Sequence, residues 1–373
     1  MLCVPSLAST TGPVLIVGTG LLGASIGLGL RAMDVPVWLR DASPTALALA
    51  RDVGAGDIDD GDAPAPQLVI IAAPPDVTAE LIAAALLEHP EAVVTDVASV
   101  KGVLLSELHR MEGVDLRRYV GSHPMAGRER SGAAAASSEL FAGRPWVITE
   151  HPASDPAAVR MVRHLATDLD ASPVHLEPRE HDEAVALVSH LPQMMASLVA
   201  ARLTDAAPES LALSGQGLRD VTRIAASDPR LWAAIITGNA AAVYGALREV
   251  RADLEVLLEA LERAAVDGPL AEGAAGAVSA LVSAGNDGAR RIPGKHGGAR
   301  RLYTEVTVLV PDEPGELGRL FSEIGQIGVN IEDFAMEHSP KQKVGMAIVS
   351  VLPSAAATLH ESLTERGWRV VMP

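Results

Sequence analysis

The sequence predicts an α/β protein with a doubly wound, mostly parallel α/β domain, then an all-helical domain and a small α+β domain. Three changes of pattern along the chain support this prediction. From residues 12 to 178, short apolar runs alternate with segments of helical periodicity, as in a parallel sheet covered by helices. From residues 179 to 286 the strand-like runs disappear, and apolar residues recur at helical spacing. A mixed pattern resumes over residues 302–373, after a glycine-rich linker at 287–301.

The composition favours a packed protein of several domains and argues against several classes of partner. A chain of 373 residues is long for one domain, and its hydrophobic content of 48% suits a buried core. The formal net charge of −17 argues against nucleic acid and anionic membrane surfaces as partners. The single cysteine, Cys3, excludes an internal disulfide and disfavours a cysteine-based metal site, so no metal is expected.

The N-terminal tail and the apolar runs together indicate a cytoplasmic protein. Residues 1–12 contain neither a basic residue nor the long apolar core that a secretory signal peptide requires. A membrane-spanning helix needs about 20 apolar residues, and no run of that length is free of charge and glycine. We therefore expect neither secretion nor a membrane partner.

Seven apolar runs predict the strands of the first domain. They are Val14–Val17, Val35–Leu39, Leu68–Ala72, Ala92–Thr95, Tyr119–Ser122, Trp146–Thr149 and Val174–Leu176. Between the last two runs, Val159, Val162, Leu165 and Leu169 recur at helical spacing, which predicts a further helix. The domain should therefore extend past Glu150, to about residue 178.

A glycine motif follows the first strand and opens a helix over Ala24–Arg31. The sequence Gly18-Thr-Gly20-Leu-Leu-Gly23 has the G-x-G-x-x-G spacing of a dinucleotide-binding turn. In such a turn the first glycine permits a tight bend, the second lets the backbone approach a pyrophosphate, and the third lets the helix pack closely on the strand. The positive end of the helix then faces the phosphates. The loop residues expected to bind the dinucleotide are Gly18, Gly20, Leu21, Leu22 and Gly23.

The residues that end the second strand bear on the choice between NAD and NADP. Asp41 stands about twenty residues after the glycine motif, where an acidic residue holds a ribose hydroxyl and would repel a 2′-phosphate. Arg40, next to it, could instead hold that phosphate or could be a solvated residue at the strand end. NAD is the expected cofactor, and NADP stays open.

The helical domain and the linker suggest assembly. Residues Leu247–Ala265 alternate charges with Leu and Val on a helical period, and the high apolar content of 179–286 indicates burial against a second subunit. A homodimer is therefore expected. In the linker, Arg290, Arg291 and Lys295 either belong to a solvated tether or dock against an acidic face or a site.

The last domain shows the order β-α-β-β-α-β of a small ferredoxin-like fold. Strands are predicted at Tyr303–Val310, Ile331–Met336, Val344–Leu352 and Trp368–Val371. The first helix opens at Pro314-Gly315 and runs through Ile324, and the second covers Ala355–Arg366.

Four further strings occur behind the glycine motif, in a fixed order. They are Thr95-Asp-Val-Ala-Ser-Val-Lys101, Gly121-Ser-His-Pro-Met-Ala-Gly127, His181-Asp-Glu-Ala-Val-Ala-Leu-Val-Ser-His-Leu-Pro192 and Arg219-Asp-Val-Thr-Arg-Ile-Ala225. With them, the chain from Val14 onward resembles the prephenate/arogenate dehydrogenase family of tyrosine biosynthesis. The last domain, with Pro311-Asp-Glu-Pro-Gly315 and Gly328-Val-Asn-Ile331, resembles an ACT domain.

The resemblance implies oxidative decarboxylation of prephenate to 4-hydroxyphenylpyruvate, with the redox chemistry supplied by the cofactor. It assigns His123 the proton of the ring hydroxyl, a role to which general-base catalysis contributes about 10²–10⁴-fold. It assigns Ser99 the support of that histidine, although a helix N-cap is an alternative. Asp96, Lys101, His181 and His190 could be simple capping, surface or structural residues.

The resemblance also implies the substrate-binding residues. Arg223 would clamp a substrate carboxylate through two parallel hydrogen bonds, or alternatively pair with Asp220. Trp232 matches a family site position, and Ser189 and Gln193, one helical turn apart, could face the same cleft. Many family members have a histidine where this chain has Gln193. That departure leaves the choice between prephenate and arogenate open.

The resemblance to an ACT domain implies regulation by an amino acid, with tyrosine as the natural effector. The candidate effector-binding residues are Asp312, Pro314, Gly315 and Asn330; a dimerisation role without an effector is the alternative. Two rival readings are a β-hydroxyacid dehydrogenase and a non-catalytic amino-acid sensor. The first is disfavoured because residues 180–285 contain no lysine. The second is disfavoured because both His123 and Arg223 are present.

Overall fold

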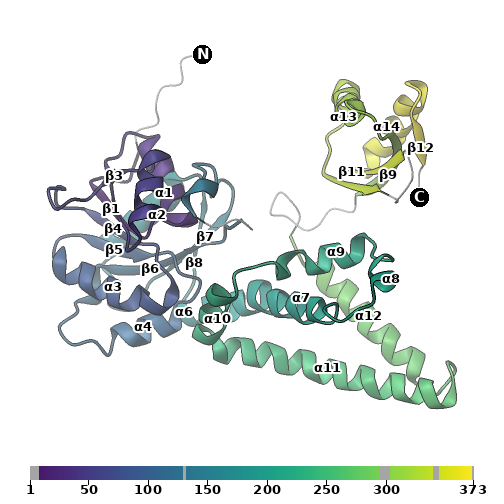
Figure 1. Cartoon of the computed structure of the whole chain (residues 1–373), viewed down its shortest axis with the longest axis horizontal. Coiled ribbons are helices and arrows are strands. Elements are labelled where there is room, and N and C mark those ends of the chain that lie inside the picture. The colour runs from purple at the N-terminus through teal and green to yellow at the C-terminus, as the bar shows by residue number, and fades with distance from the viewer. Residues whose placement is uncertain (1–7, 129–131, 294–302, 339–343, 372–373) are drawn as a thin grey trace. The chain divides into compact units, whose positions relative to one another are not determined.

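The structure is a computed structural model that describes residues 8–128, 132–293, 303–338 and 344–371 (Figure 1). Backbone contacts divide the chain into two compact units, residues 1–250 and 251–373. This division differs from the expected limits of 12–178, 179–286 and 302–373. The division falls within helix α11 (Ala240–Asp267), a single 28-residue helix.

The first unit contains an eight-stranded sheet in the order β3-β2-β1-β4-β5-β6-β7-β8. All neighbouring strands are parallel except β6 and β7, which are antiparallel, so the predicted mostly parallel sheet is confirmed. The strands are β1 (Val14–Val17), β2 (Val37–Arg40), β3 (Asp57–Ile58), β4 (Leu68–Ile71), β5 (Val93–Asp96), β6 (Tyr119–Pro124), β7 (Pro145–Thr149) and β8 (Ser172–His175).

All seven apolar runs form strands, with ends that shift by a few residues. The second begins at Val37 rather than Val35, after Pro36, which has no backbone N–H to donate to a ladder. The carbonyl of Pro36 still accepts a hydrogen bond from Val14 N, at 2.9 Å. Strand β3 was not predicted, because its two residues carry no apolar run.

Helices cover both faces of this sheet and enclose two cores. One core receives α1 (Leu21–Arg31), α2 (Pro44–Asp52) and α5 (Pro156–Asp168), and the other receives α3 (Pro75–Glu88) and α4 (Gly102–Leu108). Strand β1 serves both, because Val14 and Ile16 face the first core and Leu15 the second. This two-sided burial explains why the strands are apolar throughout.

The predicted all-helical segment is confirmed. It comprises α6 (Pro178–Val185), a π-helical turn η3 (Ala186–His190), α7 (Leu191–Ala201), α8 (Pro208–Leu211), α9 (Gln216–Thr222), a 3₁₀ turn η4 (Arg223–Ala225), α10 (Pro229–Gly238), α11 and α12 (Ala274–Arg290). Helix α12 continues four residues into the segment 287–301 expected as a linker, and within it Arg290 pairs with Asp287. Lys295 and the rest of 294–301 lie outside the described residues.

Helices α6 and α7 join through η3 into one helical stretch, 178–201. Pro192, at the start of α7, cannot donate to the preceding turn, and the π-helical turn stands directly before it. By length and composition alone this stretch would pass as a membrane span. Its His181 and Asp182 are, however, buried and hydrogen-bonded to residues of the sheet unit, as expected for a helix of a folded domain.

The C-terminal part of the second unit has the predicted βαββαβ order. Its elements are β9 (Thr304–Pro311), α13 (Glu316–Ile327), β10 (Asp333–His338), β11 (Val344–Val351), α14 (Pro353–Glu365) and β12 (Arg369–Val371). The sheet order is β10-β11-β9-β12, with antiparallel neighbours throughout. Inward-facing residues of β9 and β11 pack on α13 and α14 to form a separate core.

Candidate active site

The glycine turn between β1 and α1 has the geometry that its spacing predicts. Gly18 has φ +101°, and a Cβ atom at this position would lie 2.4 Å from the carbonyl oxygen of Ala72. A Cβ atom at Gly23 would lie 2.0 Å from the carbonyl oxygen of Gly18, so the helix packs directly on the turn. A Cβ atom at Gly20 would meet nothing within 4 Å. The open face of the turn is therefore at its second glycine, where a pyrophosphate must approach.

The N-terminus of α1 is available to an anion. Gly20 is the N-cap and supplies no capping side chain, and Leu21 and Leu22 are the first helical residues. The first backbone N–H groups of a helix have no partner within it, and they lie at the positive end of the helix dipole. The turn and the helix start thus fit the diphosphate of a dinucleotide.

Asp41 and Arg40 follow one another at the end of β2 but have different partners. Asp41 accepts hydrogen bonds from the backbone N and the hydroxyl of Thr19, at 2.6 and 2.8 Å, which ties it to the glycine turn. Arg40 pairs with Asp59 and with Glu88, the latter at 2.8 Å. Burial opposes the charge on Arg40, but these hydrogen bonds outweigh it and raise the pKa of the guanidinium. The cation beside Asp41 is therefore already neutralised by two carboxylates.

His123 lies near the end of β6 and belongs to a chain of three buried groups. Its Nδ1 atom lies 2.9 Å from Nε2 of His181, on α6, and the two rings are nearly perpendicular. Nδ1 of His181 lies 2.8 Å from Oδ1 of Asp182. Burial lowers the pKa of His123 well below its usual value, and the nearby His181, Lys101 and His190 lower it further. His123 is therefore neutral near pH 7.

Asp182 also fixes the start of α4. Its two carboxylate oxygens accept hydrogen bonds from the backbone N of Lys101 at 2.9 Å and of Gly102 at 2.8 Å. The N-cap position of α4 is Lys101, so the alternative role of Ser99 as an N-cap is wrong. Helix α4 begins at Gly102, and the carboxylate that accepts its first backbone N–H groups comes from α6. Ser99 is half-buried, and no side-chain hydrogen bond joins it to His123 within the described residues.

Behind His123 lies a buried charge cluster. Lys101 and Asp96 are 1% and 0% exposed and form an ion pair, and the hydroxyl of Tyr119 donates to Asp96 Oδ2 at 2.8 Å. Burial lowers the pKa of Lys101, although Asp96 opposes this, and burial raises the pKa of Tyr119. The simple surface role that the sequence left open for Lys101 and Asp96 is therefore wrong, although Lys101 does occupy the N-cap position of α4, without a side-chain capping bond. Tyr119, which contacts Asp96, belongs to strand β6, and the sequence around Lys101 and Asp96 does not predict that contact.

A second polar group surrounds His190. The side-chain amide of Asn239 contacts His190 Nδ1 at 3.2 Å and donates to the carbonyl of Asp182 at 2.7 Å. The ring of Trp232 meets His190 edge to face, with centroids 6.1 Å apart. Burial lowers the pKa of His190 to about 4, and the charge of His181 acts in the same direction. His190 is thus a buried, neutral member of the helical domain.

A pocket of about 320 Å³ brings together two of the four expected substrate-binding residues. It is lined by Gln193, Met194, Ser197, Ala225, Ser227, Pro229, Trp232, Ala233, Ile236 and Thr237. Gln193 is buried and its amide approaches Ser197 Oγ at 3.5 Å. Ser189 and Arg223 are not in this lining. Arg223 is exposed on η4, two residues before Ala225, and Asp220, its alternative partner, accepts a hydrogen bond from Gln216.

Sequence reasoning missed His181 and Asp182. They stand 58 and 59 positions after His123, and no periodicity relates residues that far apart. The available signal was the pair itself, a histidine followed by a carboxylate at the start of the string His181–Pro192. Such a pair could have been recognised as an oriented imidazole rather than as a helix cap.

Comparison with known proteins identifies the family. Residues 26–175 match the nucleotide-binding domain of prephenate dehydrogenase, and residues 177–273 match its dimerization domain. NovF of Streptomyces niveus, described as a probable prephenate dehydrogenase, is 37% identical over 95% of this chain and 98% of its own. The prephenate dehydrogenase of Bacillus subtilis is 25% identical over 90% and 91% of the two chains.

A solved structure agrees with these relatives. The prephenate dehydrogenase of Aquifex aeolicus, in complex with hydroxyphenyl propionate and NAD⁺, superposes with a TM-score of 0.63 at 29% identity. The match covers 74% of this chain and 97% of that one. With its glycine turn, its two matched domains and its likeness to NovF over 95% of its length, the chain is an NAD-dependent dehydrogenase and belongs to the prephenate dehydrogenase family.

Proposed function

We propose that this chain catalyses the NAD-dependent oxidative decarboxylation of prephenate to 4-hydroxyphenylpyruvate in tyrosine biosynthesis. One observation carries the proposal. His123, neutral near pH 7, lies near the carboxyl end of β6, and the glycine turn follows β1 at the same edge of the sheet. In open α/β sheets, ligands bind at that edge.

His123 is the proposed base. It takes the proton of the ring hydroxyl as the carbon that bears the hydroxyl is oxidised, and loss of carbon dioxide then makes the ring aromatic. The nicotinamide, when bound, accepts the two electrons. A histidine that is neutral at the working pH can accept this proton without first losing one of its own.

The other site residues have proposed roles in binding. Arg223, exposed on η4, clamps a substrate carboxylate, because a guanidinium binds carboxylates through two parallel hydrogen bonds. Gln193 and Trp232, which line one pocket, receive the substrate side chain. Ser99 and Ser189, both half-buried, are proposed to complete the site.

The cofactor residues support NAD over NADP. Gly18, Gly20, Leu21, Leu22 and Gly23 would hold the diphosphate, and Asp41 would accept hydrogen bonds from the adenosine ribose. Arg40 is held by Asp59 and Glu88 and is therefore not free to pair with a 2′-phosphate.

Arogenate, the amino-acid counterpart of prephenate, is the second candidate substrate, and Gln193 favours considering it. Gln193 is buried at the pocket wall, and its side chain carries one acceptor and two donors at every pH. It could serve either a pyruvyl group or an amino-acid side chain.

The test is a comparison of initial rates of NAD reduction with prephenate and with arogenate, each repeated with NADP. Turnover of prephenate with NAD supports the proposal, and turnover of arogenate alone moves the specificity to the amino-acid side chain. His123→Asn should bind NAD normally but lose turnover about 10²–10⁴-fold. Full turnover by this variant would remove His123 from its proposed role, and no turnover of either substrate by the unaltered chain would overturn the function.

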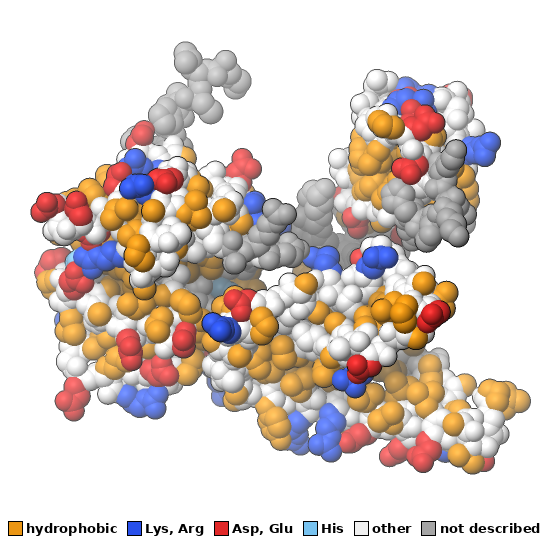
Figure 2. All heavy atoms as spheres, in the orientation of Figure 1, with side chains coloured by type: hydrophobic (Ala, Val, Ile, Leu, Met, Phe, Trp, Pro, Cys, Tyr) orange, Lys and Arg blue, Asp and Glu red, His pale blue; other side chains and the backbone are white. Residues whose placement is uncertain are grey.

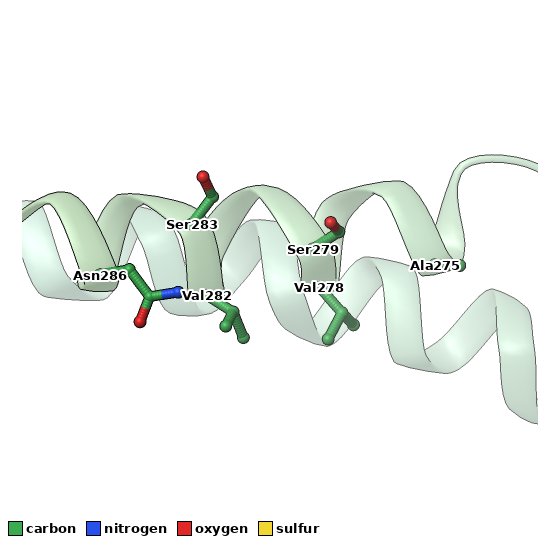
Figure 3. A pocket seen from close by; sticks show the side chains of 6 residues that line it. All are labelled: Ala275, Val278, Ser279, Val282, Ser283 and Asn286. Carbon is green, nitrogen blue, oxygen red and sulfur yellow. The ribbon is translucent and has the colours of Figure 1, made fainter. Parts of the chain in front are cut away.

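A homodimer is proposed for the helical region. One of the matched family domains is a dimerization domain, and α11 carries Leu254, Leu258 and Leu261 at helical spacing, each about half exposed. Figure 2 shows hydrophobic side chains along this helix. On α12, Val278 and Val282 point to the same side of the helix, in a hollow that no charged residue lines (Figure 3). Sedimentation of the purified chain and of a Leu258→Asp variant would test this assembly.

The C-terminal module is proposed to be an ACT domain that binds tyrosine, within a cytoplasmic enzyme. Asp312, Pro314 and Gly315 follow β9, at the sheet edge where Val310 pairs with Gly345. Asn330 precedes β10 at the opposite edge, because Asp333 pairs with Ser350 and Ser350 with Glu305. One copy thus keeps the two loops apart, which fits a site formed by paired modules. A chain whose activity and thermal stability are both unchanged by tyrosine would contradict this role.

A further inference from the structure

We propose that His181 and Asp182 are positioning residues that set the tautomer of His123 and so make it competent as a base. This inference rests on the proposed function of His123. The hydrogen-bonded chain runs from Asp182 Oδ1 to His181 Nδ1, at 2.8 Å, and from His181 Nε2 to His123 Nδ1, at 2.9 Å. The three residues come from β6 and α6 and are all buried.

The hydrogen bonds that link Asp182, His181 and His123 run in a definite direction. An ionised carboxylate can only accept, so Nδ1 of His181 must carry a proton and donate it to Asp182. In a neutral imidazole the other nitrogen is then an acceptor, so Nε2 of His181 accepts from His123 Nδ1. The remaining nitrogen of His123, Nε2, is left without a proton. That nitrogen makes no hydrogen bond within the described residues and can receive the proton of a substrate hydroxyl.

The ionised state of Asp182 is built into the fold. Backbone N–H groups of Lys101 and Gly102, at the start of α4, donate to its two oxygens. Burial opposes the charge, but these bonds and the bond from His181 outweigh it and lower the pKa of Asp182. Burial lowers the pKa of His181, whose Nδ1 bond to Asp182 opposes this shift, so His181 stays neutral near pH 7. The start of α4 thereby sets the direction of the chain.

Loss of the carboxylate would remove the group that fixes that direction. An amide at position 182 can donate to His181 Nδ1, which would leave the proton of His181 on Nε2. His181 would then donate to His123 Nδ1, and the proton of His123 would move to Nε2, where it blocks the base. The other ionisable groups near His123 and His181 are Asp96 at the end of β5, Lys101 before α4 and His190 in η3. Within the described residues, none of the three forms a hydrogen bond with a ring nitrogen of His123 or His181.

The first experiment compares kcat and KM for Asp182→Asn, His181→Gln and His181→Phe, with Glu183→Gln as control. Asp182→Asn should lower kcat about 10²–10⁴-fold, with little change in the KM for the substrate or the KM for NAD. His181→Gln can still accept from His123 and donate to Asp182, so it should retain more activity than His181→Phe. Glu183, the next residue, pairs with Arg179 at the surface, and its replacement should change nothing. An unchanged kcat in His181→Phe, which removes the acceptor of His123 Nδ1, would overturn the proposal.

The second experiment does not depend on turnover or on a variant. Side-chain ¹⁵N NMR of the unaltered full chain reports which nitrogen of each histidine carries the proton, and His123→Asn and His181→Gln assign the signals. We expect a proton on Nδ1 of both His123 and His181 near pH 7. A proton on Nε2 of His123 would overturn the inference. If neither prephenate nor arogenate is turned over while the tautomers are as expected, the proposed substrate fails and the proton chain stands.

Discussion

Gly23 packs directly against Gly18, because a Cβ atom at position 23 would lie only 2.0 Å from the Gly18 carbonyl oxygen. That oxygen is part of a turn that is itself closed against Ala72, so neither side can yield easily. Gly20, between them, would point a Cβ atom into open space. The turn therefore separates two requirements, packing at one glycine and ligand approach at another.

Alanine at Gly23 should affect mainly stability, and alanine at Gly20 mainly the binding of NAD. Gly23→Ala forces helix α1 away from β1 and should destabilise the protein by about 1–3 kcal/mol, as overpacking of a tight core does. Gly20→Ala should lower the unfolding midpoint much less, by the small cost of a poorer N-cap, and should weaken NAD binding, because its methyl group occupies the face that the diphosphate approaches. Urea unfolding and NAD titration by fluorescence measure the two effects. Equal loss of stability in both variants would contradict this division.

Cofactor choice should depend on the partners of Arg40 as well as on Asp41. Asp41→Asn removes a charged acceptor, which contributes about 1.5–3 kcal/mol, so kcat/KM with NAD should fall about 10–100-fold. NADP should gain little, because Arg40 stays paired with Asp59 and Glu88. Adding Glu88→Gln removes the charge that holds one guanidinium nitrogen of Arg40, and should raise kcat/KM with NADP. NADP use that is equal in the single and the double variant would contradict the role of Glu88.

The sequence was sufficient for the elements that depend on local pattern. The apolar runs predicted seven strands of the large sheet, and glycine spacing predicted a turn whose φ angles and close contacts agree with it. It failed for β3, whose two residues become a strand only because β2 offers an edge. It also failed for Lys101, which looks like a surface residue until Asp96 and Tyr119 enclose it.

The active-site contacts show the same limit. His123 was identified through its motif, but its partner His181 stands 58 positions later and is brought to it by the packing of α6 on the sheet. The hydrogen bond between Asp182 and the backbone N of Lys101, at the start of α4, joins residues 81 positions apart. Contacts between residues so far apart depend on tertiary packing, and no period or spacing in the sequence encodes them.

The buried ion pair of Lys101 and Asp96 should be costly to break from one side. Lys101→Met leaves Asp96 buried without its cationic partner, and among the described residues the Tyr119 hydroxyl and the backbone N of Ala98 still donate to its carboxylate. Removing one partner of a buried pair typically costs about 3–5 kcal/mol, so the urea midpoint should fall clearly. Arg117→Met, which breaks an exposed pair with Asp115, is the matched control and should leave the midpoint nearly unchanged. Similar midpoints for both variants would show that the buried pair carries no such cost.

The buried histidines should make the protein less stable in mild acid. The pKa of His190 is about 4 in the folded state, mainly because of burial, whereas an unfolded histidine titrates near 6.5. Between these values the unfolded chain binds the extra proton and the folded chain does not, so the free energy of unfolding decreases as the pH falls from about 6.5 towards 4. His123 and His181, whose pKa values are also lowered by burial, act in the same direction.

His190→Gln isolates one part of this effect. The glutamine oxygen can still accept from Asn239, whose amide lies 3.2 Å from the histidine Nδ1, but it binds no proton in this range. Urea unfolding at several pH values from 7.5 to about 4.5 should therefore show a shallower loss of stability for the variant than for the unaltered chain. The two curves should run parallel above about pH 7, where His190 is neutral in both folded and unfolded states. Parallel curves over the whole range would mean that His190 is protonated as easily in the folded protein as in the unfolded chain.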